Sequence, residues 1–271
     1  MGEAERYEEF EPPPGLRPFV RTIWTYAAPE PAATVQRIAP DGCPELVVDI
    51  GAPYEEQGED GLFRLQPRAL FAGQMTRPLA LRPTGPVELV AVRFEPDGAR
   101  GWLGRPLVEA TDRRLDMVAR LADLRLPSGD PAGQVEMMAR RLEAGRSASC
   151  WWSIDPEVRA EVEAAGRDEP PSARTPRAHR ALQRRFRDRV GVPPRILRSV
   201  LRFRRVFDHA AGPAAGWLEA GLEAGYFDQP QLARDFRRFL GCTATEWARE
   251  QAGLARRIAS QSYKTGPLSP H

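Results

Sequence analysis

The spacing of apolar residues changes once along the chain, from the two-residue period of strands to the longer period of helices. In ELVVDI, Leu46, Val48 and Ile50 fall on one face and Glu45 and Asp49 on the other, and VELVAVRF repeats this pattern with Val90, Val92 and Phe94 on a common face. Pro-Asp-Gly and Gly-Ala-Pro turn signals separate these short runs. Residues 1–104 are therefore predicted to form a mostly β, barrel-like domain.

After Pro106 the period is that of amphipathic helices. Two stripes follow the i, i+3, i+4, i+7 spacing: Leu115, Val118, Ala119 and Ala122, then Val135, Met138, Ala139 and Leu142. Another helix is predicted over Glu157 to Arg167. We expect 105–167 to be a helical connector that packs against the barrel or against a partner subunit.

The segment DEPPSARTP contains three prolines, which forbid a continuous helix, and it is predicted to be the domain boundary. A C-terminal all-α domain is assigned to 168–258, and 259–271 is expected to be a disordered tail. The predicted fold class is α+β with two domains: a barrel-like β domain, a helical connector and an all-α domain.

Charge is distributed unevenly between the two halves. The 271 residues carry a net charge of +2, but 172–271 hold 19 basic and 8 acidic residues, a charge of +11, which leaves −9 for 1–171. A basic domain of this size suits a polyanion, because neutralised phosphates release their counterions. Charge alone does not distinguish this interpretation from arginine-rich helices with merely solvated faces.

The chain shows neither a secretory signal nor a membrane span. Its first thirty residues contain acids and prolines, and no segment approaches about 18 consecutive apolar residues. Cys43, Cys150 and Cys242 are too few and too widely spaced for a disulfide framework. We expect buried reduced thiols and a cytoplasmic protein.

Helix signals are strong in the C-terminal domain. Thr175 can cap a helix that has Pro176 in its first turn and Gly191 after its end, and a longer connecting helix is predicted over 194–211. A third helix ends at Ala224, and it is followed by a glycine turn.

The glycine turn leads into a fourth helix that Asp228 can cap. Helix, glycine turn and helix is the arrangement that places a recognition helix in the major groove of DNA. Thr243 and Glu246 form a capping box for a closing helix with Trp247 on its inner side.

Two segments, LQRRFRDRVGVPPRILRSVLRFRRV and EAGYFDQPQLARDFRRFLGCTATEW, resemble the C-terminal domain of the AraC/XylS family of transcription regulators. The similarity covers about Pro176 to Arg249 and implies two helix-turn-helix units joined by a long helix. It implies base contacts in the second unit by Gln229, Pro230, Gln231 and Arg234, and in the first unit by Arg180, Gln183 and Arg184. Phosphate contacts are predicted for Arg187, Arg204 and Arg237 or Arg238.

The sequence also departs from the family pattern. The supporting helix of the first unit is replaced by the proline-containing segment, so the first unit is interpreted as degenerate. Pro230 has no side-chain donor, and Gly221 stands where the family usually has alanine. These changes place most of the predicted base readout in the second unit.

The N-terminal segments DGCPELVVDIG, FAGQMTRPLAL and VRFEPDGARGWLG resemble a cupin-like β domain of unassigned role that precedes this DNA-binding module in some bacterial regulators. The resemblance implies sensing of a small molecule or dimerisation. Five aromatic residues suit either a pocket or the core: Trp24, Tyr26, Trp102, Trp151 and Trp152.

An enzyme is disfavoured by the residue inventory. The three histidines, His179, His209 and His271, all lie outside the barrel region, and no phosphate-binding loop or nucleophile elbow occurs. We therefore predict no catalytic residues, no metal and no cofactor.

The expected partners are double-stranded DNA, a small-molecule effector, a second copy in a homodimer, and RNA polymerase if the protein is an activator. The alternative is a protein-interaction module or co-regulator that has lost specific DNA binding.

Overall fold

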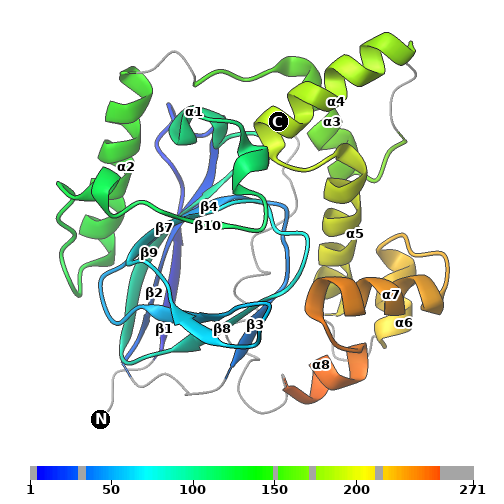
Figure 1. Ribbon diagram of the computed structural model, residues 1–271, viewed down its shortest axis with the longest axis horizontal. Coiled ribbons are helices and arrows are strands. Elements are labelled where there is room, and N and C mark those ends of the chain that lie inside the picture. Colours follow the sequence, from blue (N-terminus) through cyan, green and yellow to red (C-terminus); the bar gives the residue numbers. More distant parts are fainter. Residues whose placement is uncertain (1–4, 30–34, 149–151, 171–174, 211–215, 251–271) are drawn as a thin grey trace.

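The computed structural model describes residues 5–29, 35–148, 152–170, 175–210 and 216–250. Ten strands lie in the N-terminal half: β1 (Arg6–Phe10), β2 (Val20–Ala28), β3 (Gln36–Ile38), β4 (Glu45–Asp49), β5 (Tyr54–Gln57), β6 (Phe63–Leu65), β7 (Ala69–Ala72), β8 (Leu79–Pro83), β9 (Val87–Phe94) and β10 (Arg114–Asp116). They form two antiparallel sheets, with the orders β1-β2-β9-β4-β7-β10 and β3-β8-β5-β6. The predicted β-rich domain is confirmed (Figure 1).

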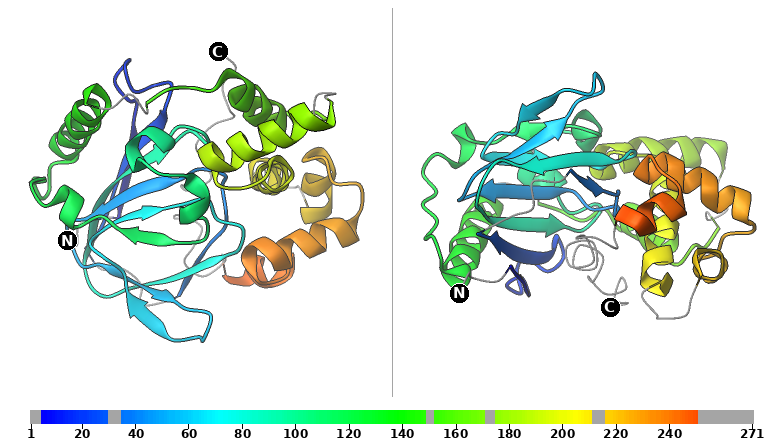
Figure 2. Two further views of the ribbon diagram at one scale, coloured as in Figure 1. Left: turned by 45° about the horizontal axis from the view of Figure 1, so that its top comes forward. Right: turned by 90° about the horizontal axis from the view of Figure 1, so that it is seen from below.

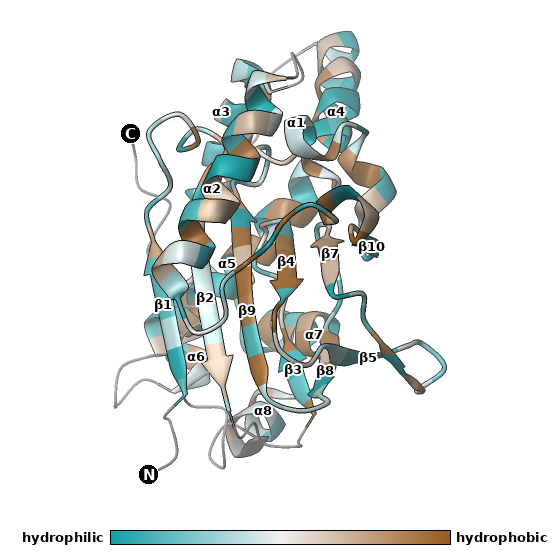
Figure 3. Cartoon of the chain, turned by 90° about the vertical axis from the view of Figure 1, so that its left-hand side faces the viewer, coloured by the Kyte–Doolittle hydropathy of each residue, from teal (hydrophilic) through white to brown (hydrophobic). Residues whose placement is uncertain are grey.

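Alternating side chains of the larger sheet build two cores. Leu46, Val90 and Val92 face helices α1 (Arg100–Leu103) and α2 (Pro131–Ser147), where the largest cluster of buried apolar residues lies. Leu89 and Ala91 face the opposite way, toward the smaller sheet. Figure 3 shows α2 crossing the outer face of the larger sheet.

The predicted helix over 115–122 is wrong. Leu115 lies in β10 opposite Phe71 of β7, and only a single 3₁₀ turn, Ala119–Leu121, follows it. The side chains of Leu115 and Met117 pack into the core, whereas Val118 is exposed. This two-residue period, together with pairing to β7, outweighs the short helical pattern.

The other two connector helices form as predicted, but they pack against different domains. Helix α2 is capped by Asp130 and buries Met138, Ala139 and Leu142 against the larger sheet. Helix α3 (Pro156–Gly166) packs instead against the C-terminal helices. The expected connector is therefore divided between the two domains.

The five C-terminal helices are α4 (Pro176–Val190), α5 (Pro194–Ala210), α6 (Trp217–Glu223), α7 (Gln229–Leu240) and α8 (Ala244–Glu250). Together with α3 they lie to one side of the β domain (Figure 2). Among the described residues, none of the helices has the length and apolar character needed to cross a membrane. The expected tail, 259–271, lies outside the described residues.

Side chains from the β domain hold the C-terminal helices at several points. The carboxylate of Asp97 accepts two hydrogen bonds of 3.0 Å from the Arg159 Nε. At Gly42, where φ is +84°, a Cβ would lie 2.8 Å from the Leu201 side chain of α5. A larger residue at position 42 would therefore be strained at this φ and would crowd the Leu201 side chain.

The aromatic residues named from the sequence have different surroundings. Trp102 is buried in the outer core, and Trp152 packs edge to face on Phe19. Trp24 and Tyr26 lie between the two sheets. Trp151 and Cys150 lie outside the described residues, and Cys43 and Cys242 are buried, as expected.

Candidate nucleic-acid interface

The second helix-turn-helix unit consists of α6, a tight turn at Gly225 and α7. Gly225 has φ +94°, which suits glycine, and Asp228 caps α7 by accepting a 2.7 Å hydrogen bond from the Gln231 backbone N–H. The Gln231 side-chain oxygen in turn accepts a 3.0 Å hydrogen bond from the Phe227 N–H. These reciprocal bonds fix the entry into the predicted recognition helix.

The inner side of α7 is anchored in an aromatic core. Phe236 and Phe239 are fully buried, and Phe236 packs edge to face against Phe203 of α5, with centroids 5.1 Å apart. A Cβ on Gly221 of α6 would lie 2.6 Å from the Leu232 side chain of α7. The glycine that stands in place of the usual alanine therefore permits α6 and α7 to approach closely.

The outer side of α7 presents the predicted base-contacting and phosphate-contacting residues to solvent. Five of them have exposed side chains: Gln229, Pro230, Arg234, Arg237 and Arg238. Gln231 is half-buried, and its side-chain oxygen is engaged at the helix start. Asp235 lies on the other side of the helix, where it accepts a 2.8 Å hydrogen bond from the Tyr226 hydroxyl. The exposed face is consequently cationic.

The first unit presents a second basic helix, α4. Thr175 caps its start, Gly191 ends it with φ +96°, and Leu182 and Phe186 face the buried side. Three arginines that were predicted to contact DNA are exposed: Arg180, Arg184 and Arg187. Gln183 is half-buried, and its Nε2 lies 2.8 Å from the His179 Nε2.

Two other arginines of α4 have structural partners. Arg185 Nη1 lies 3.1 Å from Asp155 Oδ2, and Arg189 donates a hydrogen bond to the Ser153 carbonyl. Both interactions join α4 to the start of α3. They separate the structural arginines of this helix from those that face solvent.

The connection into α4 is longer than the turn of the second unit. Nine residues separate α3 from α4, whereas five separate α6 from α7. The described part of this connection, 167–170 and Thr175, contains no helix. Helix α3 packs mainly on α5, and the Arg198 Nη2 on α5 lies 3.7 Å from the Glu161 carboxylate.

The structure corrects the expectation for Arg204. Its side chain is buried and only 5% exposed, because α5 is enclosed by α3, α6 and α7. Its positive charge lowers the pKa of the neighbouring Asp208 carboxyl. Burial of Asp208 has the larger effect, so the pKa of that carboxyl is raised overall. Arg204 is therefore not placed to contact a phosphate.

The β domain contacts the C-terminal ends of both exposed basic helices. Arg100 of α1 binds the Asp188 carboxylate near the end of α4, and the Thr111 hydroxyl donates a 2.8 Å hydrogen bond to the Gly191 carbonyl. Arg37 of β3 donates a 3.3 Å hydrogen bond to the Leu240 carbonyl at the end of α7. The same domain thus contacts the ends of both α4 and α7.

The described residues include no group of three or more histidine, cysteine, aspartate or glutamate side chains arranged to hold a metal ion. Cys43 is buried beside Arg21, and burial raises the pKa of its thiol to about 12. The neutral thiol is therefore unsuited to nucleophilic chemistry near neutral pH.

Comparisons with known proteins agree with this geometry. Residues 172–250 match a family of helix-turn-helix domains, and residues 8–116 match a domain of unknown function (DUF6597). No curated protein has a matching sequence.

Two similar solved structures are of ToxT from Vibrio cholerae. One has a TM-score of 0.46 and 7% identity and covers 86% of this chain and 99% of its own chain. The other is an unsaturated fatty acid complex, with a TM-score of 0.43, 8% identity, and coverage of 90% and 94%. The family match over 172–250 shows that this part of the chain is a helix-turn-helix domain of the AraC type.

Proposed function

We propose that this protein is a sequence-specific regulator of transcription in which α7 reads most of the bases. The observation that carries the proposal is the exposure of Gln229 and Arg234 on a helix whose start is fixed by reciprocal hydrogen bonds. Arginine can donate two hydrogen bonds to guanine O6 and N7, and glutamine can pair with adenine. Both residue types at the start of α7 are therefore suited to base edges in the major groove.

In this proposal the first helix-turn-helix unit contributes to DNA binding in a different way from the second. Exposed Arg180, Arg184 and Arg187 give α4 the charge needed for phosphates and for a guanine contact. The lengthened connection between α3 and α4 removes the tight turn that positions a recognition helix in the second unit. We therefore assign to α4 a mainly electrostatic role and interpret the first unit as degenerate.

A small molecule bound by the β domain is proposed to control DNA binding. Support comes from the contacts of this domain with the ends of both α4 and α7. A ligand that moves the β domain against these helices would change the spacing of α4 and α7.

One unit reads only a few base pairs, so useful specificity requires a second copy of the protein or a partner. A homodimer on an inverted repeat satisfies this need, and RNA polymerase is the expected further partner if the protein is an activator. The same argument makes the half-site spacing a measurable property of the complex.

Selection of bound sequences from random duplex DNA tests the proposal. We would use the full-length protein at two salt concentrations, together with the Arg234→Ala and Arg140→Ala variants. Arg140 is the matched control because it is an exposed arginine on α2, in the β domain. Enrichment of one motif by the wild type and by Arg140→Ala, with a relaxed base position for Arg234→Ala, is the expected result.

Other outcomes assign a different role to the domain. A two-part motif about one helical turn between centres would show that α4 also reads bases. Lack of enrichment at either salt concentration would overturn the proposal and favour the interaction module. Loss of all binding at the higher salt concentration would leave only non-specific attraction to phosphates.

A further inference from the structure

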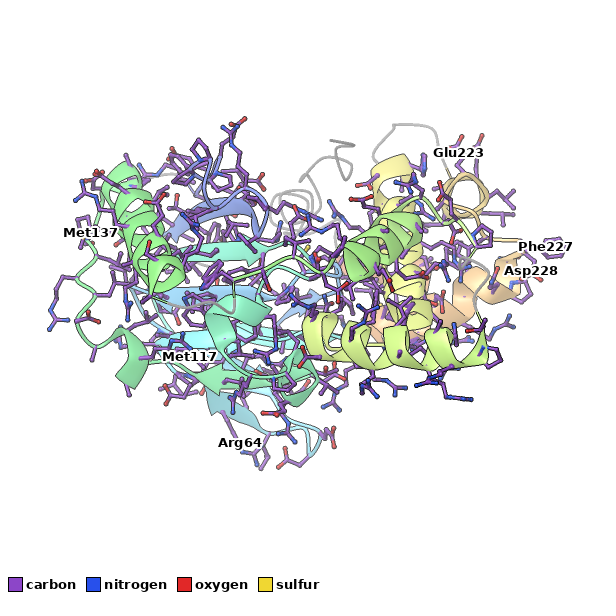
Figure 4. The ribbon with its side chains drawn as sticks, turned by 90° about the horizontal axis from the view of Figure 1, so that it is seen from above. Arg64, Met117, Met137, Glu223, Phe227 and Asp228 are labelled. Atoms are coloured by element: carbon purple, nitrogen blue, oxygen red, sulfur yellow. The ribbon has the colours of Figure 1, made fainter. Side chains whose placement is uncertain are left out.

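Phe227 is the most exposed large apolar side chain among the described residues. It is 89% exposed, whereas the other large hydrophobic residues at the surface range from 46% to 62%. In Figure 4, Phe227 and Asp228 lie at the end of the molecule opposite Met137 of α2, and Phe227 projects away from the domain. Exposing a whole phenyl ring to water is unfavourable, so its position calls for a physical explanation.

The ring does not serve the local fold. A hydrophobic residue directly before the N-cap commonly packs against the fourth residue of the helix, which here is Leu232. Leu232 is instead buried among Phe236 and its neighbours, and the adjacent Tyr226 fills the core position. The backbone of Phe227 is nevertheless held, because its N–H donates to the Gln231 side chain.

The position of the ring relative to α7 indicates what covers it. Phe227 directly precedes Asp228, the N-cap of α7, and exposed Gln229 and Pro230 follow in the first turn of the helix. The ring therefore stands at the N-terminal end of α7, the part of a recognition helix that contacts base edges. An apolar group beside the polar side chains of such a helix matches the major groove, where the thymine 5-methyl group is the apolar element between hydrogen-bonding edges.

We propose that Phe227 reads thymine by contacting its 5-methyl group in the major groove, next to the bases that Gln229 and Arg234 contact. This inference rests on the proposed function and adds a specificity-determining residue to it. Only the backbone of Phe227 is held, and the phenyl ring itself forms no hydrogen bond. The ring is therefore available to cover a methyl group. Phe227 thereby adds a base contact just before the first turn of α7, where the Pro230 side chain has no hydrogen-bond donor.

The test replaces each thymine of the selected duplex, one at a time, by uracil, which differs only by the missing methyl group. Dissociation constants are measured for the wild type, Phe227→Ala and Leu222→Ala. Leu222 is the matched control, since it is an exposed apolar residue on α6 rather than at the N-terminal end of α7. We expect one position at which uracil weakens wild-type and Leu222→Ala binding by about fourfold, the effect of one buried methyl group. Phe227→Ala should bind both duplexes equally.

Three results would overturn the inference. The first is a selected duplex without any uracil-sensitive position. The second is an unchanged uracil penalty in Phe227→Ala, and the third is equal affinity of Phe227→Ala and wild type for the thymine duplex, which would point to a protein partner for this ring. Failure to select any duplex would instead contradict the proposed function itself. Failure of the Phe227 inference can therefore be distinguished from failure of the proposed function. An unchanged melting temperature of Phe227→Ala confirms that the variant is folded.

Discussion

The Arg100 guanidinium of the β domain lies against the Asp188 carboxylate of α4, with Nε 3.1 Å from Oδ2. Asp188 stands in the last turn of α4, where the helix dipole disfavours a negative charge. The Arg100 side chain is only 10% exposed and offsets that cost. This pair therefore joins the two domains and neutralises an otherwise unfavourable acid.

Substitution of Arg100 by alanine is expected to destabilise the protein by about 1–3 kcal/mol, because the carboxylate loses a charged hydrogen-bond partner. Thermal unfolding measures the change. The matched control is Arg105→Ala, since Arg105 is exposed and lies 3.9 Å from Glu109. Equal melting temperatures for the two variants would show that the interdomain pair stabilises the protein no more than an exposed surface pair does.

Arg234→Ala and Arg187→Ala are expected to weaken DNA binding in different ways. A lost base contact costs about 1–3 kcal/mol on the selected duplex and relaxes one position. A lost phosphate contact weakens binding to all sequences and lowers the slope of log K against log salt by about 0.9. Fluorescence anisotropy on selected and scrambled duplexes separates the two, and identical profiles for both variants would contradict the assignment.

Much of the C-terminal domain could be predicted because its signals are local. Thr175, Asp228 and Gly191 mark helix ends through their own hydrogen bonds or backbone angles, and the structure places all three as expected. The exposed arginines of α4 and α7 follow from the same helical period. Such features depend on residues within one turn of each other.

The predictions that the structure corrects failed because they depend on residues far apart in the sequence. Strand β10 is stable only because β7, more than forty residues earlier, offers it an edge. Arg204 is buried because three helices surround α5, which its own period does not reveal. The exposure of Phe227 likewise depends on its neighbours, because it is Tyr226 that takes the core position.

Gly221→Ala is expected to destabilise the C-terminal domain by about 1–3 kcal/mol. The new methyl group would meet the buried Leu232 side chain and push α6 away from α7. Gly145→Ala is the matched control, because Gly145 lies near the end of α2 with open space around it, and alanine there should stabilise by about 0.5–1 kcal/mol. Urea unfolding measures both changes, and an increase in stability for Gly221→Ala would show that α6 and α7 are less closely packed than the structure indicates.

Asp49 is expected to make stability depend on pH. Its side chain is 7% exposed, and burial raises its pKa to about 7. In the described residues its Oδ1 has no hydrogen-bond partner. Because the unfolded carboxyl has a pKa near 3.9, the folded protein holds the proton more tightly between about pH 4 and pH 7. The free energy of unfolding should therefore fall as pH rises through this window and level off above pH 7.

The variant Asp49→Asn removes the titrating group but keeps the shape of the side chain. Relative to the wild type it should gain on the order of 2–4 kcal/mol at pH 8, and this gain should shrink steadily toward pH 4, because the wild-type carboxyl is then neutral in both states. Urea unfolding at intervals of one pH unit measures the difference. Asp123→Asn, at a carboxylate that is 79% exposed, is the control and should follow the wild-type curve. A gain for Asp49→Asn that is the same at every pH would mean that Asp49 is ionised in the folded protein throughout, and that water or a bound cation reaches its carboxylate.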